Sequence, residues 1–146
     1  MSNDEKKIPL MLMVKHLHKE WGAYMKKVSA EAGVPDSYRL IVMYLSRNPG
    51  ATQKEIAEHS KVTHVAVSNT IKDMENDGYI RKEIDEKDRR VTRLYLTEKG
   101  KKQDDMMKER IHGADRKITE TLTPEKEAEF YGTIEKIIET IRKELM

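Results

Sequence analysis

The stretch from Thr52 to Thr97 constrains this chain most, because it places two short helices directly before a basic β-hairpin. The apolar positions that two crossed helices need recur in its first half, at Ile56, Ala57, Val62, Val67 and Ile71. Ala57 is small where the second helix must pack closely, and we expect Val62 to fill the turn between the helices. One helix of such a pair fits the major groove of duplex DNA, and an arginine-tipped hairpin fits the adjacent minor groove.

Two helices are expected before this stretch. The first runs from Pro9 to a stop at Gly33, with apolar residues at three- and four-residue spacing: Leu10, Val14, Leu17, Trp21, Tyr24, Met25 and Val28. The second begins at Asp36 or Ser37 and stops at Asn48-Pro49-Gly50. Its expected inward residues are Leu40, Ile41, Tyr44 and Leu45.

Polar residues mark where the next elements begin and end. Thr52, with Glu55 three residues later, is a capping box that opens the third helix. Thr63 can cap the fourth helix, which ends at Gly78. Two strands follow, and their apolar members are Tyr79, Ile80, Ile84, Val91, Leu94 and Leu96. Because the alternation is imperfect, it favours a short exposed hairpin over part of a large sheet.

Two further helices complete the chain. Thr97 is expected to cap the fifth helix, and Thr123, with Pro124 at the first helical position, opens the sixth. The fifth carries Met106, Met107, Ile111, Ala114 and Ile118, and the sixth carries Phe130, Ile134, Ile137, Ile138, Ile141 and Leu145. The predicted fold class is α+β and mostly α, a winged helix-turn-helix with long terminal helices.

The run DGYIRKEIDEKDRRVTRLYLTEKG, Asp77 to Gly100, resembles the wing region of the MarR family of winged-helix transcription regulators. The family's motif has an acidic residue and an arginine two positions apart at the wing tip, then an apolar strand ending in Leu-Thr-x-x-Gly. The matching residues are Asp88, Arg90, Leu94, Leu96, Thr97 and Gly100. The resemblance covers essentially the whole chain, because a long helix before the winged helix and two helices after it complete the family's layout.

This resemblance implies one MarR-type domain over residues 1–146, with the DNA-binding winged helix at 36–100 and dimerisation helices at 8–33 and 101–146. The sixth helix packs either on its own chain alone or on a second copy as well, and the resemblance favours a homodimer. A chain with only 37% hydrophobic and 37% charged residues agrees with a core completed by pairing. Lys61 departs from the family, where glycine is usual in the turn, and a left-handed lysine would cost about 1 kcal/mol more than glycine.

The fourth helix carries the residues expected to contact bases in DNA. Val67, Ile71 and Met74 face the core, so the opposite side presents His64, Val65, Ser68, Asn69 and Lys72. Asparagine can pair bidentately with adenine, valine can contact a thymine methyl group, and histidine and lysine can reach bases or phosphates. Thr63 and Ser68 are expected phosphate ligands. The alternative is that these are ordinary solvated residues of a surface helix.

The hairpin concentrates positive charge on a chain whose formal net charge is only +2. Residues 79–102 contain nine Lys or Arg against five Asp or Glu, which indicates a surface directed at an anion. By resemblance Arg90 is the minor-groove residue, and Asp88 is expected to hold an arginine in position through a bidentate pair. Arg89 and Arg93 are expected to contact phosphate, with a solvated turn as the alternative.

Four residues lie where the first two helices would approach the winged helix: Trp21, Tyr24, Tyr38 and Met43. In the MarR family this junction commonly holds a small aromatic or amphipathic effector. These residues are therefore the candidate effector pocket, and ordinary core aromatics are the alternative. The sequence does not identify a ligand.

Other classes of site find no support in the sequence. The chain has no cysteine, which excludes disulfides, thiolate zinc sites and thiol-based oxidant sensing. The five histidines, His16, His18, His59, His64 and His112, include no pair at the three- or four-residue spacing of a helical metal site. We therefore expect no metal and no cofactor, while the resemblance leaves open whether the histidines bind a metal. No phosphate-binding glycine loop, Ser/His/Asp set or metal-protease signature argues for an enzyme.

The chain is also expected to be cytoplasmic and to make no contact with a membrane. No apolar run reaches the roughly 18 residues of a membrane span. The start MSNDEKK does not have the pattern of a signal peptide.

The expected function is that of a transcription regulator, a ligand-responsive repressor that binds a pseudo-palindromic operator in double-stranded DNA as a homodimer. Two alternatives come from other classes: a winged-helix protein-interaction module whose basic wing meets an acidic partner, and a non-specific architectural DNA binder. Salt-dependent binding to a defined operator, against weak binding to random duplex, separates the three. The operator, the regulated genes, the effector and the sign of regulation cannot be read from the sequence.

Overall fold

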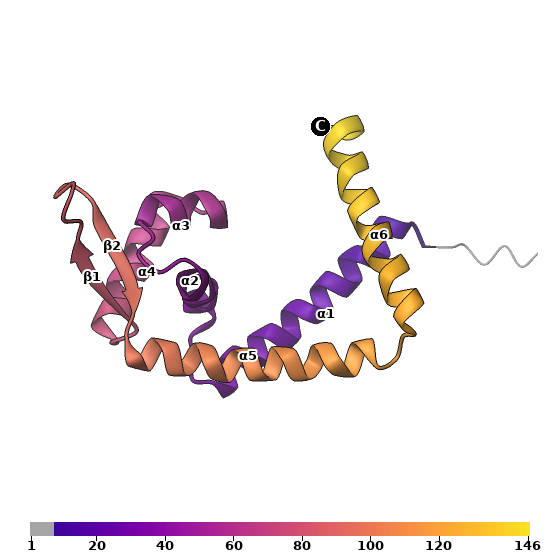
Figure 1. Ribbon diagram of the computed structural model, residues 1–146, viewed down its shortest axis with the longest axis horizontal. Coiled ribbons are helices and arrows are strands. Elements are labelled where there is room, and N and C mark those ends of the chain that lie inside the picture. The colour runs from indigo at the N-terminus through magenta and orange to yellow at the C-terminus, as the bar shows by residue number, and fades with distance from the viewer. Residues whose placement is uncertain (1–7) are drawn as a thin grey trace, which may run out of the picture. The chain divides into compact units, whose positions relative to one another are not determined.

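Helices account for most of the residues that the computed structural model describes, which are residues 8–146. Along the chain the elements are α1 (Leu10–Glu31), α2 (Asp36–Arg47), α3 (Gln53–Ser60), α4 (His64–Asn76), β1 (Ile80–Ile84), β2 (Thr92–Leu96), α5 (Glu98–Thr119), α6 (Pro124–Thr140) and a short π-helical end, η1 (Ile141–Leu145) (Figure 1). The chain forms two units; the first ends at Lys108, within α5, and the second is Glu109–Met146. The predicted class, mostly helical with a small β-hairpin, is confirmed.

The predicted caps of the helix-turn-helix are present. At the start of α3, Thr52 Oγ1 accepts a hydrogen bond from the Glu55 N–H at 3.2 Å, and the Glu55 carboxylate accepts one from the Thr52 N–H at 2.8 Å. At the start of α4, Thr63 Oγ1 accepts from the Ala66 N–H at 3.2 Å. Each cap satisfies an N–H that has no partner within its helix, so both helices start where the sequence places the threonines.

The turn between α3 and α4 is made by a left-handed lysine. Lys61 has φ 52° and ψ 35°, the conformation that glycine adopts without a Cβ clash. The lysine therefore adopts this left-handed turn at a cost of about 1 kcal/mol relative to glycine.

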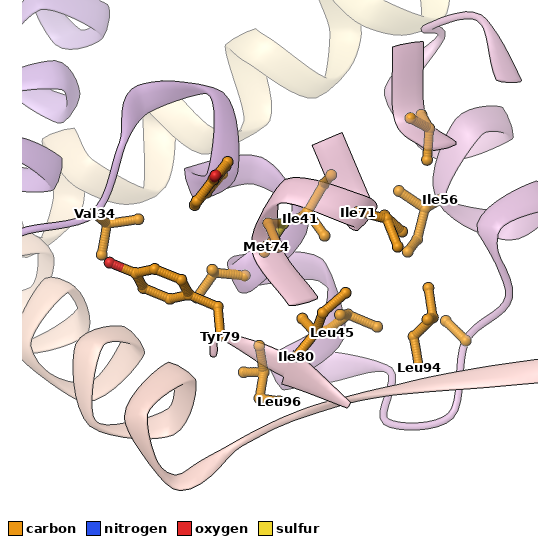
Figure 2. Packing of buried hydrophobic residues seen from close by; sticks show 14 of the residues in the cluster. Val34, Ile41, Leu45, Ile56, Ile71, Met74, Tyr79, Ile80, Leu94 and Leu96 are labelled. Carbon is orange, nitrogen blue, oxygen red and sulfur yellow. The ribbon is translucent and has the colours of Figure 1, made fainter. Parts of the chain in front are cut away.

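The buried core of the first unit draws on every element of the winged helix (Figure 2). Ile56 of α3 and Ile71 of α4 are fully buried, as are Leu45 of α2 and Leu94 of β2. Val67, Ile71 and Met74 recur at three- and four-residue spacing and form the inward side of α4. The predicted inward side of α4 is therefore confirmed, and its opposite side is left for another role.

Two expected core positions are wrong. Leu40 is exposed, because α2 buries Tyr38, Ile41, Val42 and Leu45, a face rotated from the expected one. Val62 is also exposed and does not fill the turn, because Ile56, Ala57 and Val67 already close the core beside it.

The wing is a two-stranded antiparallel hairpin in which Ile80 pairs with Leu96 and Ile84 pairs with Thr92. The loop after α2 adds a single bridge, because Leu94 N–H donates to Ala51 O at 3.0 Å and Gly50 N–H donates to Leu94 O at 2.9 Å. The base of the wing is thereby attached to the helical core. Ile84, farther from the base, is exposed.

The end of α4 and the start of α5 approach each other at two small residues. Thr97 Oγ1 donates to Gly78 O at 2.5 Å and accepts from the Gly100 N–H at 3.2 Å, so Thr97 caps α5 as expected. A Cβ atom on Gly100 would lie 2.3 Å from Tyr79 O, far inside contact distance. The glycine of the Leu-Thr-x-x-Gly motif is therefore required by close packing against the backbone.

The second unit consists of the last part of α5, α6 and η1. Thr123 Oγ1 accepts from the Lys126 N–H at 3.3 Å with Pro124 at the first helical position, as predicted. The apolar residues of α6 and η1 are at best half-buried within this chain, and Phe130, Ile138 and Leu145 are exposed.

Candidate nucleic-acid interface

The outward side of α4 is free of the core along its whole length. His64, Val65, Ser68, Asn69 and Lys72 are all exposed, and Val65 keeps 71% of its surface. This is the set that the sequence predicted to face outward. An apolar side chain so exposed on an otherwise polar helix face has the form needed to contact a thymine methyl group.

The start of α4 is suited to a phosphate. Thr63 Oγ1 is used as a hydrogen-bond acceptor by the helix, which leaves its hydroxyl hydrogen for an outside acceptor. His64 is the first residue of the helix and is exposed. The N–H groups and the positive end of the helix dipole also favour an anion here.

The wing turn is built on the side chain of Asp85. Its Oδ1 accepts from the Lys87 N–H at 2.8 Å and from the Asp88 N–H at 3.0 Å, a local turn typical of aspartate. The Val91 N–H then donates to Asp88 O at 3.0 Å, which closes the chain back toward β2. Arg89 and Arg90, which lie in this turn, are exposed.

Asp88 and Arg90 form the predicted bidentate pair. Arg90 Nε donates to Asp88 Oδ1 and one terminal nitrogen donates to Oδ2, each at 3.0 Å, while the Arg90 N–H also donates to Oδ1 at 3.1 Å. These contacts, the side-chain bond first, lower the pKa of Asp88 and raise that of Arg90. The Arg90 side chain nevertheless keeps 90% of its surface exposed, so the pair orients the guanidinium without covering it.

Arg93 has a partner inside the protein that sequence reasoning missed. Its Nε donates to Asp85 Oδ2 at 2.5 Å, and a terminal nitrogen donates to Gly50 O at 3.0 Å. The Arg93 side chain, followed by the N–H groups of Asp88 and Lys87, lowers the pKa of Asp85 to about 2. Arg93 therefore ties the wing turn to the loop after α2, and its contact with phosphate stays a prediction.

The four residues of the candidate effector pocket have different surroundings. Trp21 and Tyr24, both half-buried on α1, have ring centroids 5.4 Å apart. Tyr38 belongs to the core: its ring meets Tyr79 edge-on at 5.4 Å, and its hydroxyl donates to Asp77 Oδ2 at 2.7 Å. Burial and then the bond to Asp77 raise the pKa of Tyr38 to about 12. Met43 packs against the edge of the same core.

Two other kinds of site do not occur among the described residues. Over residues 8–146 no helix is both long and apolar enough to cross a membrane. Within the same range no three histidine, aspartate or glutamate side chains gather in a way that could hold a metal ion.

Comparison with known proteins agrees with this geometry. A model of the MarR family matches residues 32–91, which span α2 to the wing tip. The chain is 31% identical over 107 residues to the HTH-type transcriptional regulator YybA of Bacillus subtilis, covering 73% of this chain and 68% of that protein. The chain belongs to the MarR family. It is also 25% identical over 117 residues to the HTH-type transcriptional regulator BilQ of Clostridium symbiosum, covering 80% and 81% of the two chains.

Solved structures give the same result for this MarR-family protein. A MarR transcriptional regulator from Methanosarcina mazei superposes with a TM-score of 0.74 at 25% identity, covering 94% of this chain and 98% of that one. A MepR variant from S. aureus bound to an oligodeoxyribonucleotide superposes with a TM-score of 0.64 at 18% identity, covering 92% and 99%. The relatives are transcriptional regulators, and this chain is a DNA-binding transcription regulator rather than an enzyme.

Proposed function

We propose that the protein binds a specific pseudo-palindromic operator as a homodimer and represses transcription until a small-molecule effector releases it. Residues 36–100 supply the DNA-binding part, and the helical segments 8–33 and 101–146 supply the dimer contacts. Repression follows from occupancy, since a dimer that covers two successive major grooves excludes other proteins from that duplex.

The observation that carries this proposal is the exposed outward side of α4 beside a wing whose arginine is already oriented. Ser68, Asn69 and Val65 offer a hydroxyl, an amide and an apolar contact to base edges, and Lys72 offers a charge. Arg90 is held by Asp88 with its remaining donors in solvent, the form required for entry into a narrow minor groove. Thr63, His64, Arg89 and Arg93 complete the set as proposed phosphate contacts.

Two uncovered apolar surfaces support a homodimer. On α1 the exposed residues include Leu10, Met11, Leu12, Met13 and Leu17. In the second unit Phe130, Tyr131 and Ile138 of α6 are exposed. Large exposed apolar side chains grouped in this way are typical of an interaction surface. A second copy of the chain presents the same two surfaces, so the two copies can pair symmetrically.

We propose that the effector binds near Trp21 and Tyr24 of α1 and Met43 of α2, with the buried Tyr38 as one wall of its site.

The proposal is tested by replacing Asn69 with alanine. If Asn69 reads an adenine, Asn69→Ala costs roughly 1–3 kcal/mol on the preferred site and relaxes base preference at one position per half-site. Quantitative binding to the preferred duplex and to single-base variants measures both effects. Asn76→Ala, at the other end of the same helix, is the matched control and leaves base preference unchanged.

A uniform loss on every duplex would make Asn69 a phosphate contact and remove it from base recognition. Equal affinity of the wild type for operator and random duplex would favour the architectural alternative, and no binding to any duplex would favour a protein-interaction module.

A further inference from the structure

A cavity of about 340 Å³ lies inside the first unit, away from the outward side of α4. The end of α2 contributes Leu45 and Ser46, the wing strands contribute Arg81 and Tyr95, and the first turns of α5 contribute Asp104 and Asp105, with Pro49, Leu96 and Lys101 completing the walls. Its volume is at the low end of the range of about 300–1,000 Å³ typical of small-molecule sites. None of the residues of the candidate effector pocket lines it.

Asp104 is the most unusual group in this cavity. It is 2% exposed, so its carboxylate is removed from bulk water. Oδ2 accepts from the Ser46 hydroxyl at 2.6 Å and lies 2.5 Å from Lys108 Nζ. Oδ1 is buried and has no hydrogen-bond partner among the described residues. Buried carboxylate oxygens are normally satisfied, so an unpartnered one beside a cavity indicates a missing donor.

The other charges around the cavity indicate the sign of that donor. Arg81 pairs with Glu83 and lies over the Tyr95 ring, with the guanidinium carbon 4.7 Å from the centroid. Lys101 pairs with Glu98 at 3.4 Å. The three cations at the cavity, Arg81, Lys101 and Lys108, are thus each paired with an acid, Lys108 with Asp104 itself. Asp104 Oδ1 still has no donor among the described residues, and Asp105 adds a second carboxylate to the same wall. What Asp104 Oδ1 lacks is a hydrogen-bond donor, and beside two carboxylates a positively charged donor is favoured. Leu45, Pro49 and Leu96 can contact the apolar part of the molecule that carries this donor.

We propose that this cavity binds a small organic cation, a protonated amine or amidinium on a compact apolar body, whose charged group donates to Asp104 Oδ1. Asp105 adds attraction from the same wall. Ser46 and Lys108 hold Oδ2 and so position the carboxylate. The site requires no DNA and stands apart from the proposed operator binding, so either proposal can fail alone.

The test uses three probes with nearly the same body and different charge: phenethylamine, 2-phenylethanol and phenylacetate. Amide NMR spectra of the full chain are recorded during titration with each. Phenethylamine shifts the amides of Tyr95, Lys101 and Asp104 and binds about tenfold or more tightly than 2-phenylethanol, because the alcohol cannot form the charged hydrogen bond. Phenylacetate binds more weakly than either.

Variants assign the cation to Asp104. Asp104→Asn lowers phenethylamine affinity about tenfold or more, while the affinity for 2-phenylethanol changes little. Asp105→Asn, an exposed position, gives a smaller loss and remains informative if Asp104→Asn fails to fold. Asp115→Asn, exposed farther along α5, is the matched control and changes neither affinity. A thermal melt of each variant checks the fold.

Three results would overturn the site. The first is equal binding of phenethylamine and 2-phenylethanol, which would mean that charge is not recognised and that a water molecule satisfies Oδ1. The second is unchanged phenethylamine affinity in folded Asp104→Asn, or in Asp105→Asn if the former does not fold. The third is a set of shifts centred on Trp21 and Tyr24, which would place the amine in the candidate effector pocket instead.

Discussion

Single residues at the wing tip are arranged so that one arginine is oriented and still exposed. Asp88 uses both carboxylate oxygens on Arg90, so the guanidinium cannot rotate freely, yet the side chain is almost entirely in solvent. An arginine held in advance loses less conformational entropy when it enters a groove than a free one does. We therefore propose that the negative charge of Asp88 is tolerated near DNA because Asp88 positions Arg90.

Arg90→Ala should weaken binding more on operators with A/T-rich flanks than on those with G/C-rich flanks. A-tracts narrow the minor groove and deepen its negative potential, so the arginine in that groove is worth roughly 1–3 kcal/mol, and less on G/C flanks. Asp88→Ala should behave as a weaker copy, because the arginine is then no longer held in position. Fluorescence anisotropy on the two duplex types measures the difference.

Arg89→Ala is the matched control. If Arg89 contacts phosphate, as we propose, its loss weakens binding to all duplexes similarly and reduces the salt slope by about one unit. Equal losses of affinity for Arg90→Ala on both flank types would rule out the minor-groove role. Tighter binding by Asp88→Ala would show that its charge only repels phosphate.

Residue-level predictions from the sequence succeeded where the interaction is local. The Thr52–Glu55 box and the Asp88–Arg90 pair each join residues two or three apart, so a short motif contains both partners; the second motif came from the family resemblance. The pair between Asp85 and Arg93 spans the wing turn, and that between Ser46 and Asp104 spans 58 positions. Such contacts depend on how elements pack, which spacing does not reveal. The one available signal was Asp85 itself, placed where a turn begins.

At the scale of elements, the start of α5 packs closely against the start of the wing because Gly100 has no side chain. Gly100 brings the first turn of α5 so close to Tyr79 O that a Cβ would clash with the backbone. Lys99 Nζ also donates to Asp77 O at 2.7 Å and lies 4.5 Å from the centroid of the Tyr79 ring. The junction thus links α4, β1 and α5.

Gly100→Ala should destabilise the fold by about 1–3 kcal/mol, because the overlap falls on backbone that cannot move away cheaply. Chemical denaturation followed by circular dichroism measures the change in the free energy of unfolding. Gly113→Ala in the same helix is the control: a Cβ there meets nothing within 4 Å, so alanine should be neutral or stabilising by up to about 1 kcal/mol. A destabilisation equal for both would show that side-chain packing elsewhere along α5, and not the approach to Tyr79, sets the cost.

Elements were easier to predict than the faces they bury. The six predicted helices and both strands are present, and each starts within a few residues of its expected position, because threonine caps and Gly or Pro residues mark the boundaries. The π-helical end, η1, was not predicted. The predicted buried face of α2 was wrong at Leu40, which is exposed although it is as apolar as the residues that pack. Hydrophobic periodicity predicts that a segment is a helix. Which of two adjacent apolar stripes becomes buried depends on the elements that pack against that helix.

At the scale of the whole molecule, the second unit leaves apolar surface that its own residues do not cover. In α6 and η1 no residue is fully buried, although Ile134, Ile137 and Ile141 recur at helical spacing. A helix of this pattern is stable in water only when its apolar face is packed. The sequence predicted this stripe, and we propose that a second copy of the chain covers it.

Replacing Ile137 and Ile141 with glutamate should lower both dimer content and DNA affinity, because two charges enter an apolar seam. Sedimentation at micromolar concentration measures the first effect, and operator binding measures the second. Glu135→Gln and Glu139→Gln on the polar side of the same helix serve as controls and leave both unchanged. A wild-type protein that sediments as a monomer would remove the dimer from the proposal.

The central claim, that a two-fold dimer reads a defined operator through α4 and the wing, is tested most directly by selecting bound duplexes from a random pool with the full-length protein. The proposal predicts an inverted repeat whose half-sites lie about 10 base pairs apart, one helical turn. It also predicts affinity at least about a thousandfold above random duplex, falling steeply with salt. Recovery of no recurrent sequence, or of a single unrepeated element bound by one chain, would contradict it.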